Sequence, residues 1–186
     1  MSQDTASSDS ATRENVPVSL TDPETVRGRE DIVFSTETQK HEEFDHCAVD
    51  IEERSVVGVE NADGEFLLLV HDDLGLALLP HGVVESGDWA AVARQGVEGQ
   101  TGIAVTLDGI EAVRDVEHVV EGSENAQTTS YRVLFRGSPV SGEIRECKQR
   151  TEAGSDGWRA GWFADLPEDS APPQGGPADD LHHFLG

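Results

Sequence analysis

Residues 79–103, LPHGVVESGDWAAVARQGVEGQTGI, decide the fold. A short apolar run ends at Pro80 and is followed by the loop HGVVESGD. From Trp89 to Val97 the apolar residues then recur at near-helical spacing. Gly102 is the type of residue that ends many helices, because it adopts a left-handed backbone conformation without strain. This stretch therefore predicts a strand, a loop, a helix up to about Gln100 and then a second strand.

The rest of the chain predicts a mixed sheet rather than a doubly wound parallel one, because strands and helices do not alternate regularly. Asp63-Gly64 is a strong hairpin-turn signal between two apolar runs. Other strands are expected at 74–80, over 103–120 as one or two strands, at 131–144 with a turn at Ser138-Pro139, and at 157–169. A short helix is expected at 178–186.

The order hairpin, strand, Gly loop, helix, Thr-Gly, strand resembles the Nudix hydrolase superfamily, whose box reads G-x5-E-x7-R-E-U-x-E-E-x-G-U with U aliphatic. The resemblance runs from about Ser55 to the C-terminus. It implies an α/β (α+β) fold, namely an α/β/α sandwich with a central mixed sheet. It also implies a nucleoside-diphosphate substrate and a Mg²⁺ or Mn²⁺ cofactor, which would polarise the diphosphate and activate the attacking water.

Both ends of the box match the family pattern. Gly82 takes the place of its leading glycine, and the matching positions after it are Glu85, Gly87, Gly102 and Ile103. His81 stands where a second glycine is usual, and Asp88 stands in for the first box glutamate. One residue fewer than in the family separates Gly82 from Gly102. His81 and Gly82 are the candidate ligand-binding residues; His81 as a solvated loop histidine is the alternative.

The helical part of the box lacks its acidic face. Gly96, Gly99 and Gln100 occupy the positions of three glutamates, which span about 100° of an α-helix. The glycines have no side chain and the glutamine offers only a neutral carbonyl, so the resemblance leaves a metal site in doubt. Each glycine also disfavours a helix by about 1 kcal/mol relative to alanine. Drift, or close approach of a ligand or another chain, would explain glycine at these positions.

Three carboxylates remain as candidate catalytic residues: Glu85, Asp88 and Glu98. Glu98 lies about 200° around the helix from position 96, so a solvated surface glutamate is the alternative for it. Asp88 immediately precedes the helix, where a carboxylate accepts backbone N–H groups, so helix capping is the alternative there. Trp89, Tyr131, Trp158, Trp162 and Phe163 could stack a nucleobase, although for Trp162 and Phe163, beside a Leu-Pro turn, core packing is the favoured interpretation.

Charge and composition bear on compartment and partners. The formal net charge is −24, with 37 acidic and 13 basic residues. Because the acids are spread throughout, we interpret them as an adaptation of a halophilic proteome to molar salt, with a basic protein partner as the alternative. Such a charge argues against nucleic-acid binding. The lack of an apolar run of about 18 residues argues against a membrane span, and the N-terminus has no signal-peptide pattern, so a cytoplasmic protein is expected.

Residues 1–45 are polar and lack hydrophobic periodicity, which predicts an acidic, disordered or loosely attached arm before a Nudix-like domain over 46–186. Cys47 and Cys147 are too few for a disulfide framework. A zinc site at His41, His46 and Cys47 lacks a second ligand pair at zinc spacing.

Three functions remain open at this point. The first is a protein that binds a nucleotide-like or diphosphate-containing ligand with hydrolysis weak or lost. The second is an active Mg²⁺-dependent pyrophosphohydrolase that uses unorthodox ligands. The third is a non-enzymatic interaction module, for example a homodimer.

Overall fold

The structure of the protein is a computed structural model, which describes residues 19–41, 53–120, 128–144, 158–171 and 176–185. Its larger sheet has the strand order β1-β6-β7-β2-β5. These strands are β1 (Val33–His41), β6 (Ile103–Val120), β7 (Thr128–Gly142), β2 (Arg54–Val59) and β5 (His81–Val83). The sheet is mixed: β1 runs parallel to β6 and β2 parallel to β7, whereas β6–β7 and β2–β5 are antiparallel.

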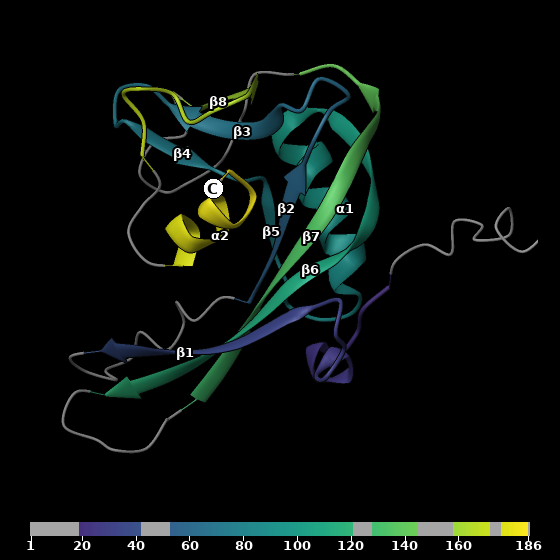
Figure 1. The fold of residues 1–186 in the computed structure, drawn as a ribbon, viewed down its shortest axis with the longest axis vertical. Coiled ribbons are helices and arrows are strands. Elements are labelled where there is room, and N and C mark those ends of the chain that lie inside the picture. The colour runs from purple at the N-terminus through teal and green to yellow at the C-terminus, as the bar shows by residue number, and fades with distance from the viewer. Residues whose placement is uncertain (1–18, 42–52, 121–127, 145–157, 172–175, 186) are drawn as a thin grey trace, which may run out of the picture.

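A smaller antiparallel sheet has the order β4-β3-β8. Its strands are β4 (Leu76–Leu78), β3 (Phe66–His71) and β8 (Trp158–Phe163). The helical elements are the 3-10 helix η1 (Pro23–Val26), α1 (Trp89–Thr101) and α2 (Gly176–Leu185). Figure 1 shows α1 and α2 on opposite sides of the larger sheet. The predicted α/β fold with a mixed central sheet is confirmed.

Two apolar clusters fill the spaces on the two sides of the larger sheet. Since successive strand residues point to opposite faces, Val57 and Val59 of β2 pack with α1, whereas Val56 packs with α2. On the second side, α2 buries Leu181 completely. A Cβ on Gly58 of β2 would lie 2.5 Å from the Phe184 ring, so this glycine lets α2 approach the strand closely.

The predicted helix of the box forms with both of its expected end residues. Asp88 is the N-cap of α1, and Gly102 is its C-cap in the left-handed conformation, with φ of 81°. The C-terminal helix also forms, starting at Gly176. No helix in the described part of the chain is long and apolar enough to cross a membrane.

The predicted Ser-Pro turn is wrong. Ser138 and Pro139 lie inside β7, opposite Thr106 and Val105 of β6. The register shifts next to this pair, where the partner of Ala104 is Ser141. A bulge of this kind tolerates proline, which has no N–H for the ladder.

The hairpin and the Gly loop also differ from expectation. Gly64 does form a turn, with its N–H donating to the Asn61 carbonyl at 3.2 Å. Beyond the single bridge between Glu60 and Phe66, however, β2 and β3 enter different sheets. The start of the expected loop is instead strand β5, an edge strand paired with β2.

Residues 19–41, expected within the loosely attached arm, are packed onto the domain. Leu20, Val26 and Ile32 are each at most 5% exposed and belong to the core beside α1. β1 adds a parallel edge strand to β6. Polar composition concealed this packing because a parallel edge strand needs few buried side chains of its own. Residues 1–18 and 42–45 of the expected arm, and both cysteines, lie outside the described residues.

Candidate functional site

The start of α1 is fixed by the Asp88 carboxylate. Its Oδ1 accepts hydrogen bonds from the backbone N–H groups of Ala90 and Leu20, both at 2.9 Å, and its Oδ2 accepts from the Ser19 hydroxyl at 3.0 Å. Burial opposes ionisation, but these hydrogen bonds outweigh it and lower the pKa of Asp88. Both carboxylate oxygens are therefore occupied by the helix end and the N-terminal segment, and the capping interpretation of Asp88 is confirmed.

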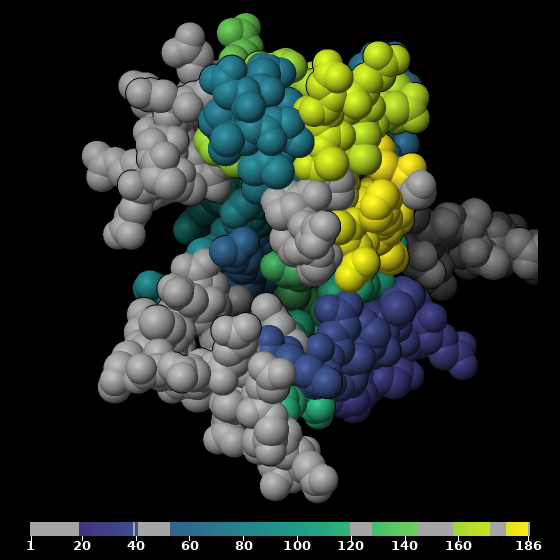
Figure 2. All heavy atoms as spheres, turned by 90° about the vertical axis from the view of Figure 1, so that its left-hand side faces the viewer, coloured from purple at the N-terminus to yellow at the C-terminus, as the bar shows by residue number. Residues whose placement is uncertain are grey.

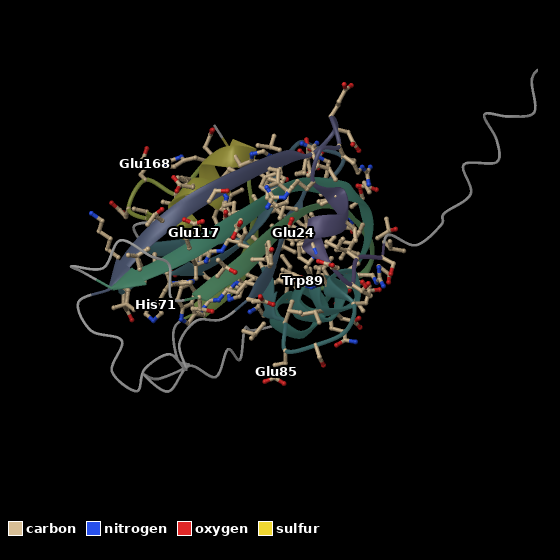
Figure 3. All side chains as sticks on the ribbon, turned by 90° about the horizontal axis from the view of Figure 1, so that it is seen from below. Glu24, His71, Glu85, Trp89, Glu117 and Glu168 are labelled. Atoms are coloured by element: carbon tan, nitrogen blue, oxygen red, sulfur yellow. The ribbon has the colours of Figure 1, made fainter. Side chains whose placement is uncertain are left out.

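Glu85 and Glu98 lie apart from Asp88 and from each other. Both are exposed, Glu85 on the loop before α1 and Glu98 on the outer surface of the helix. Figure 3 shows Glu85 projecting away from the body, while Trp89 lies toward the sheet. Within the described residues, no three His, Cys, Asp or Glu side chains converge closely enough to hold a metal ion.

Gly96 lies against the backbone of β5. A Cβ on Gly96 would be 2.6 Å from the His81 carbonyl oxygen and 2.9 Å from the Gly82 nitrogen, closer than such atoms approach one another. Gly82 makes the reciprocal approach, since its own Cβ would lie 2.8 Å from the Val92 carbonyl oxygen. Two glycines therefore let helix and strand meet backbone to backbone, and no side chain fits at position 96.

Gln100 strengthens the same contact. Its Oε1 accepts a hydrogen bond from the His81 backbone N–H at 2.9 Å. Gly99, by contrast, faces open space, because a Cβ added there would meet no atom within 4 Å. A Mg²⁺ or Mn²⁺ ion needs several oxygen ligands, usually including carboxylates. The residues present on this helix face do not fit such an ion.

The His81 side chain points to the other side of the sheet. His81 pairs with Val56, which faces α2, whereas Gly82 pairs with Ser55 on the side of α1. The imidazole Nδ1 lies 3.0 Å from the Leu79 carbonyl oxygen. It lines a cavity of about 20 Å³ whose remaining lining residues are Arg54, Val56, Leu78, Leu79, Arg132 and Asp180.

Arginines from three neighbouring strands lie side by side, and two of them, Arg54 and Arg132, line this cavity. Arg54 of β2 pairs with Arg132 of β7, and Arg132 pairs with Arg114 of β6. Asp180 of α2 inserts between the last two: its Oδ1 is 2.9 Å from Arg114 Nε, and its Oδ2 is 3.3 Å from Arg132 Nε. Burial raises the pKa of Asp180 to about 6, against the opposing attraction of the two guanidinium groups.

Sequence reasoning did not identify this cluster. Arg54, Arg132 and Asp180 are far apart in the chain, and only the parallel register of β2 and β7 brings the two arginines together. The sequence contains one weak indication of the cluster. The chain has only 13 basic residues, and Arg54, Arg114 and Arg132 each lie in an apolar segment that is expected to form a strand. Asp180, in the closing helix, carried no signal of its own.

The aromatic residues serve packing. Trp89 is 3% exposed and belongs to the core beside α1, where Trp158, Trp162 and Tyr131 also pack. Phe163 packs on the side of α2. The core-packing interpretation is therefore confirmed for Trp162 and Phe163, and the other three aromatic side chains also pack at the core.

Comparison with known structures identifies the fold. The chain is similar to a mutator MutT protein from Bacillus halodurans, with a TM-score of 0.51 and 18% identity over 73% of this chain and 83% of that one. It is also similar to a Nudix hydrolase from Nitrosomonas europaea (TM-score 0.49, 20% identity, 72% of this chain and 90% of that one). A third similar structure is a UDP-X diphosphatase (TM-score 0.48, 14% identity, 72% of this chain), of which the chain spans 60%.

The similarity to the MutT protein shows that the chain has the same fold, the Nudix-type fold that the sequence resemblance implied. No protein-family model matches the sequence, and no curated protein matches it.

Proposed function

We propose that this chain binds a nucleotide-like, phosphate-bearing small molecule and has lost metal-dependent hydrolysis. The observation that supports the loss of hydrolysis is the backbone contact of Gly96 with His81 and Gly82. This contact fills the space of the first glutamate of the metal face. Restoring a carboxylate there requires the helix and the strand to separate.

The alternative of an active hydrolase with unorthodox ligands has less support. Asp88 is engaged by Ser19, Leu20 and Ala90, and the side chains of Glu85 and Glu98 are exposed at separate places. Three oxygen ligands on one ion would require all three side chains to converge. Binding without metal requires no such rearrangement, since backbone groups of the loop and the arginines near His81 provide the contacts for an anionic ligand.

Ligand binding is expected to be independent of divalent metal. We expect ADP-ribose or UDP-glucose to stabilise the full chain in molar KCl by about 2.7 kcal/mol at one hundred times the dissociation constant. The shift in the unfolding midpoint should be the same in EDTA as in Mg²⁺. Thermal unfolding across a panel of nucleoside diphosphate compounds measures this. A shift that appears only with Mg²⁺, or no shift with any compound, contradicts the proposal.

A further inference from the structure

We propose that Arg54 and Arg132 form a binding site for a phosphate group of the ligand, and that the Asp180 carboxylate occupies part of this site in its absence. We call Arg54, Arg114, Arg132 and Asp180 the arginine cluster. The inference rests on the proposed function, for which it names the group of the ligand that the protein holds and the residues that hold it.

The first argument is the placement of like charges. Paired residues on adjacent strands place their side chains about 5 Å apart, on the same face of the sheet. Arg54, Arg132 and Arg114 are paired in this way across β2, β7 and β6. Like charges directly opposite each other destabilise a sheet unless anions lie between them. Three of the 13 basic residues of this acidic chain therefore lie next to one another on one face of the sheet.

The second argument is that Asp180 neutralises this charge incompletely. One carboxylate is shared between Arg114 and Arg132, and it is only 3% exposed. Although Arg114 Nε and Asp180 Oδ1 are 2.9 Å apart, their alignment is poor, and neither atom has a hydrogen-bond partner within the described parts of the chain. Arg114 has a second partner in Glu37, at 2.8 Å.

The charge of Arg132 is less well compensated than that of Arg114. Burial lowers its pKa, and this effect exceeds the opposing attraction of Asp180. Its distance from Asp180 is 3.3 Å, longer than the 2.7–2.9 Å typical of a strong charged hydrogen bond. A further anion close to Arg132 would therefore be stabilised.

The third argument is the cavity beside these side chains. Its volume of about 20 Å³ holds one or two water molecules, since one water needs at least about 10–15 Å³ by the same measure. A phosphate group needs more room, and movement of the Asp180 side chain would provide it. Exchange of one anion for another keeps the charge balance of the buried arginines. Guanidinium groups also match phosphate oxygens in a bidentate geometry.

The helix that carries Asp180 lies at the surface of the protein, although the Asp180 side chain itself is 3% exposed. Asp180 lies on α2, which Figure 2 shows in the middle of one face, between β8 above and β1 below. His81, at the start of the box, lines the same cavity as Arg54 and Arg132. A ligand whose phosphate lies at the arginine cluster would therefore also lie next to His81 of β5, at the start of the box.

The inference is tested by titrating inorganic phosphate into the full chain at pH 8 in molar KCl, with calorimetry as the readout. Asp180→Asn removes the competing charge at constant shape and should bind phosphate about tenfold more tightly than wild type. Arg54→Gln should weaken phosphate binding about tenfold or more. Arg136→Gln is the matched control, because Arg136 lies on the same strand as Arg132 but pairs with Glu60 and Glu111. The affinity of Arg136→Gln for phosphate should stay within about twofold of the wild-type value.

Equal phosphate affinity in wild type, Asp180→Asn and Arg54→Gln overturns the inference. If Asp180→Asn does not fold, the comparison of Arg54→Gln with Arg136→Gln decides, and equal affinities in these two overturn it. ADP-ribose titrations separate the two proposals. Unchanged ADP-ribose binding in Arg54→Gln overturns the phosphate site and leaves the proposed function intact. Absence of ADP-ribose binding in wild type counts against the proposed function, while the phosphate series still tests the site.

Discussion

Replacing Gly96 by alanine is expected to destabilise the protein by about 2–3 kcal/mol, although the same change would stabilise an isolated helix by about 1 kcal/mol. The added methyl group would lie 2.6 Å from the His81 carbonyl oxygen, so the helix or the strand must move. Both partners are backbone and cannot swing aside as a side chain would. Urea unfolding in molar KCl, followed by tryptophan fluorescence, gives the free energy of unfolding.

Gly99→Ala is the matched control for this experiment. It lies on the same helix, three residues further along, and a Cβ there meets no atom within 4 Å. It should therefore stabilise the protein by up to about 1 kcal/mol, through helix propensity alone. Equal changes in stability at the two positions would contradict the close contact between α1 and β5.

Replacing Asp180 by alanine is expected to destabilise the protein by about 3 kcal/mol when no multivalent anion is present. The change leaves Arg132 without its carboxylate partner in a buried place, while Arg114 keeps Glu37. Asp179→Ala is the control, because Asp179 is the exposed neighbour of Asp180 on the same helix. Equilibrium unfolding gives the free energy of unfolding of the two variants. An equal decrease in both would show that the buried ion pairs of Asp180 do not stabilise the protein more than an exposed carboxylate does.

The raised pKa of Asp180 makes the stability of the protein depend on pH. Its folded pKa of about 6 exceeds the ordinary value of 3.8, so the folded state binds more protons between these values. The part of the stability that comes from proton binding at Asp180 is thus greatest below about pH 4 and is lost as the pH rises through 6. The ion pairs of the ionised carboxylate, which Asp180→Ala removes, remain above that pH. Carboxylates with lowered pKa, such as Asp88, act in the opposite direction. The pH dependence due to Asp180 is therefore the difference between the wild-type and Asp180→Asn stability curves.

Local sequence signals predicted the elements that local interactions determine. The limits of α1 follow from Asp88 and Gly102, whose capping contacts are made with backbone groups of the helix itself. Residues 19–41 and the Ser138-Pro139 pair were misjudged because their structure depends on partners elsewhere in the chain. An edge strand paired in parallel and a bulge in a long strand leave little trace in hydrophobic periodicity.

In the candidate site, too, local features could be predicted from the sequence, whereas features that depend on distant parts of the chain could not. The sequence has a glycine at position 96, where the Nudix pattern has a glutamate, and it left drift and close approach of a ligand or another chain as explanations. The structure shows a close approach at Gly96, but the approaching segment is the chain's own strand β5 rather than a ligand or another chain. The arginine cluster was unpredictable for a different reason, since its members meet only through the pairing of β2, β7 and β6.

The most direct test of the central claim is a hydrolysis assay in molar KCl with Mg²⁺ or Mn²⁺, across nucleoside diphosphate compounds such as ADP-ribose and UDP-glucose. The close contact of α1 with β5 and the missing glutamates predict no metal-dependent product above a metal-free control. Metal-dependent turnover that falls sharply in Glu98→Gln or Glu85→Gln would contradict the account, because it would require these exposed carboxylates to hold the metal.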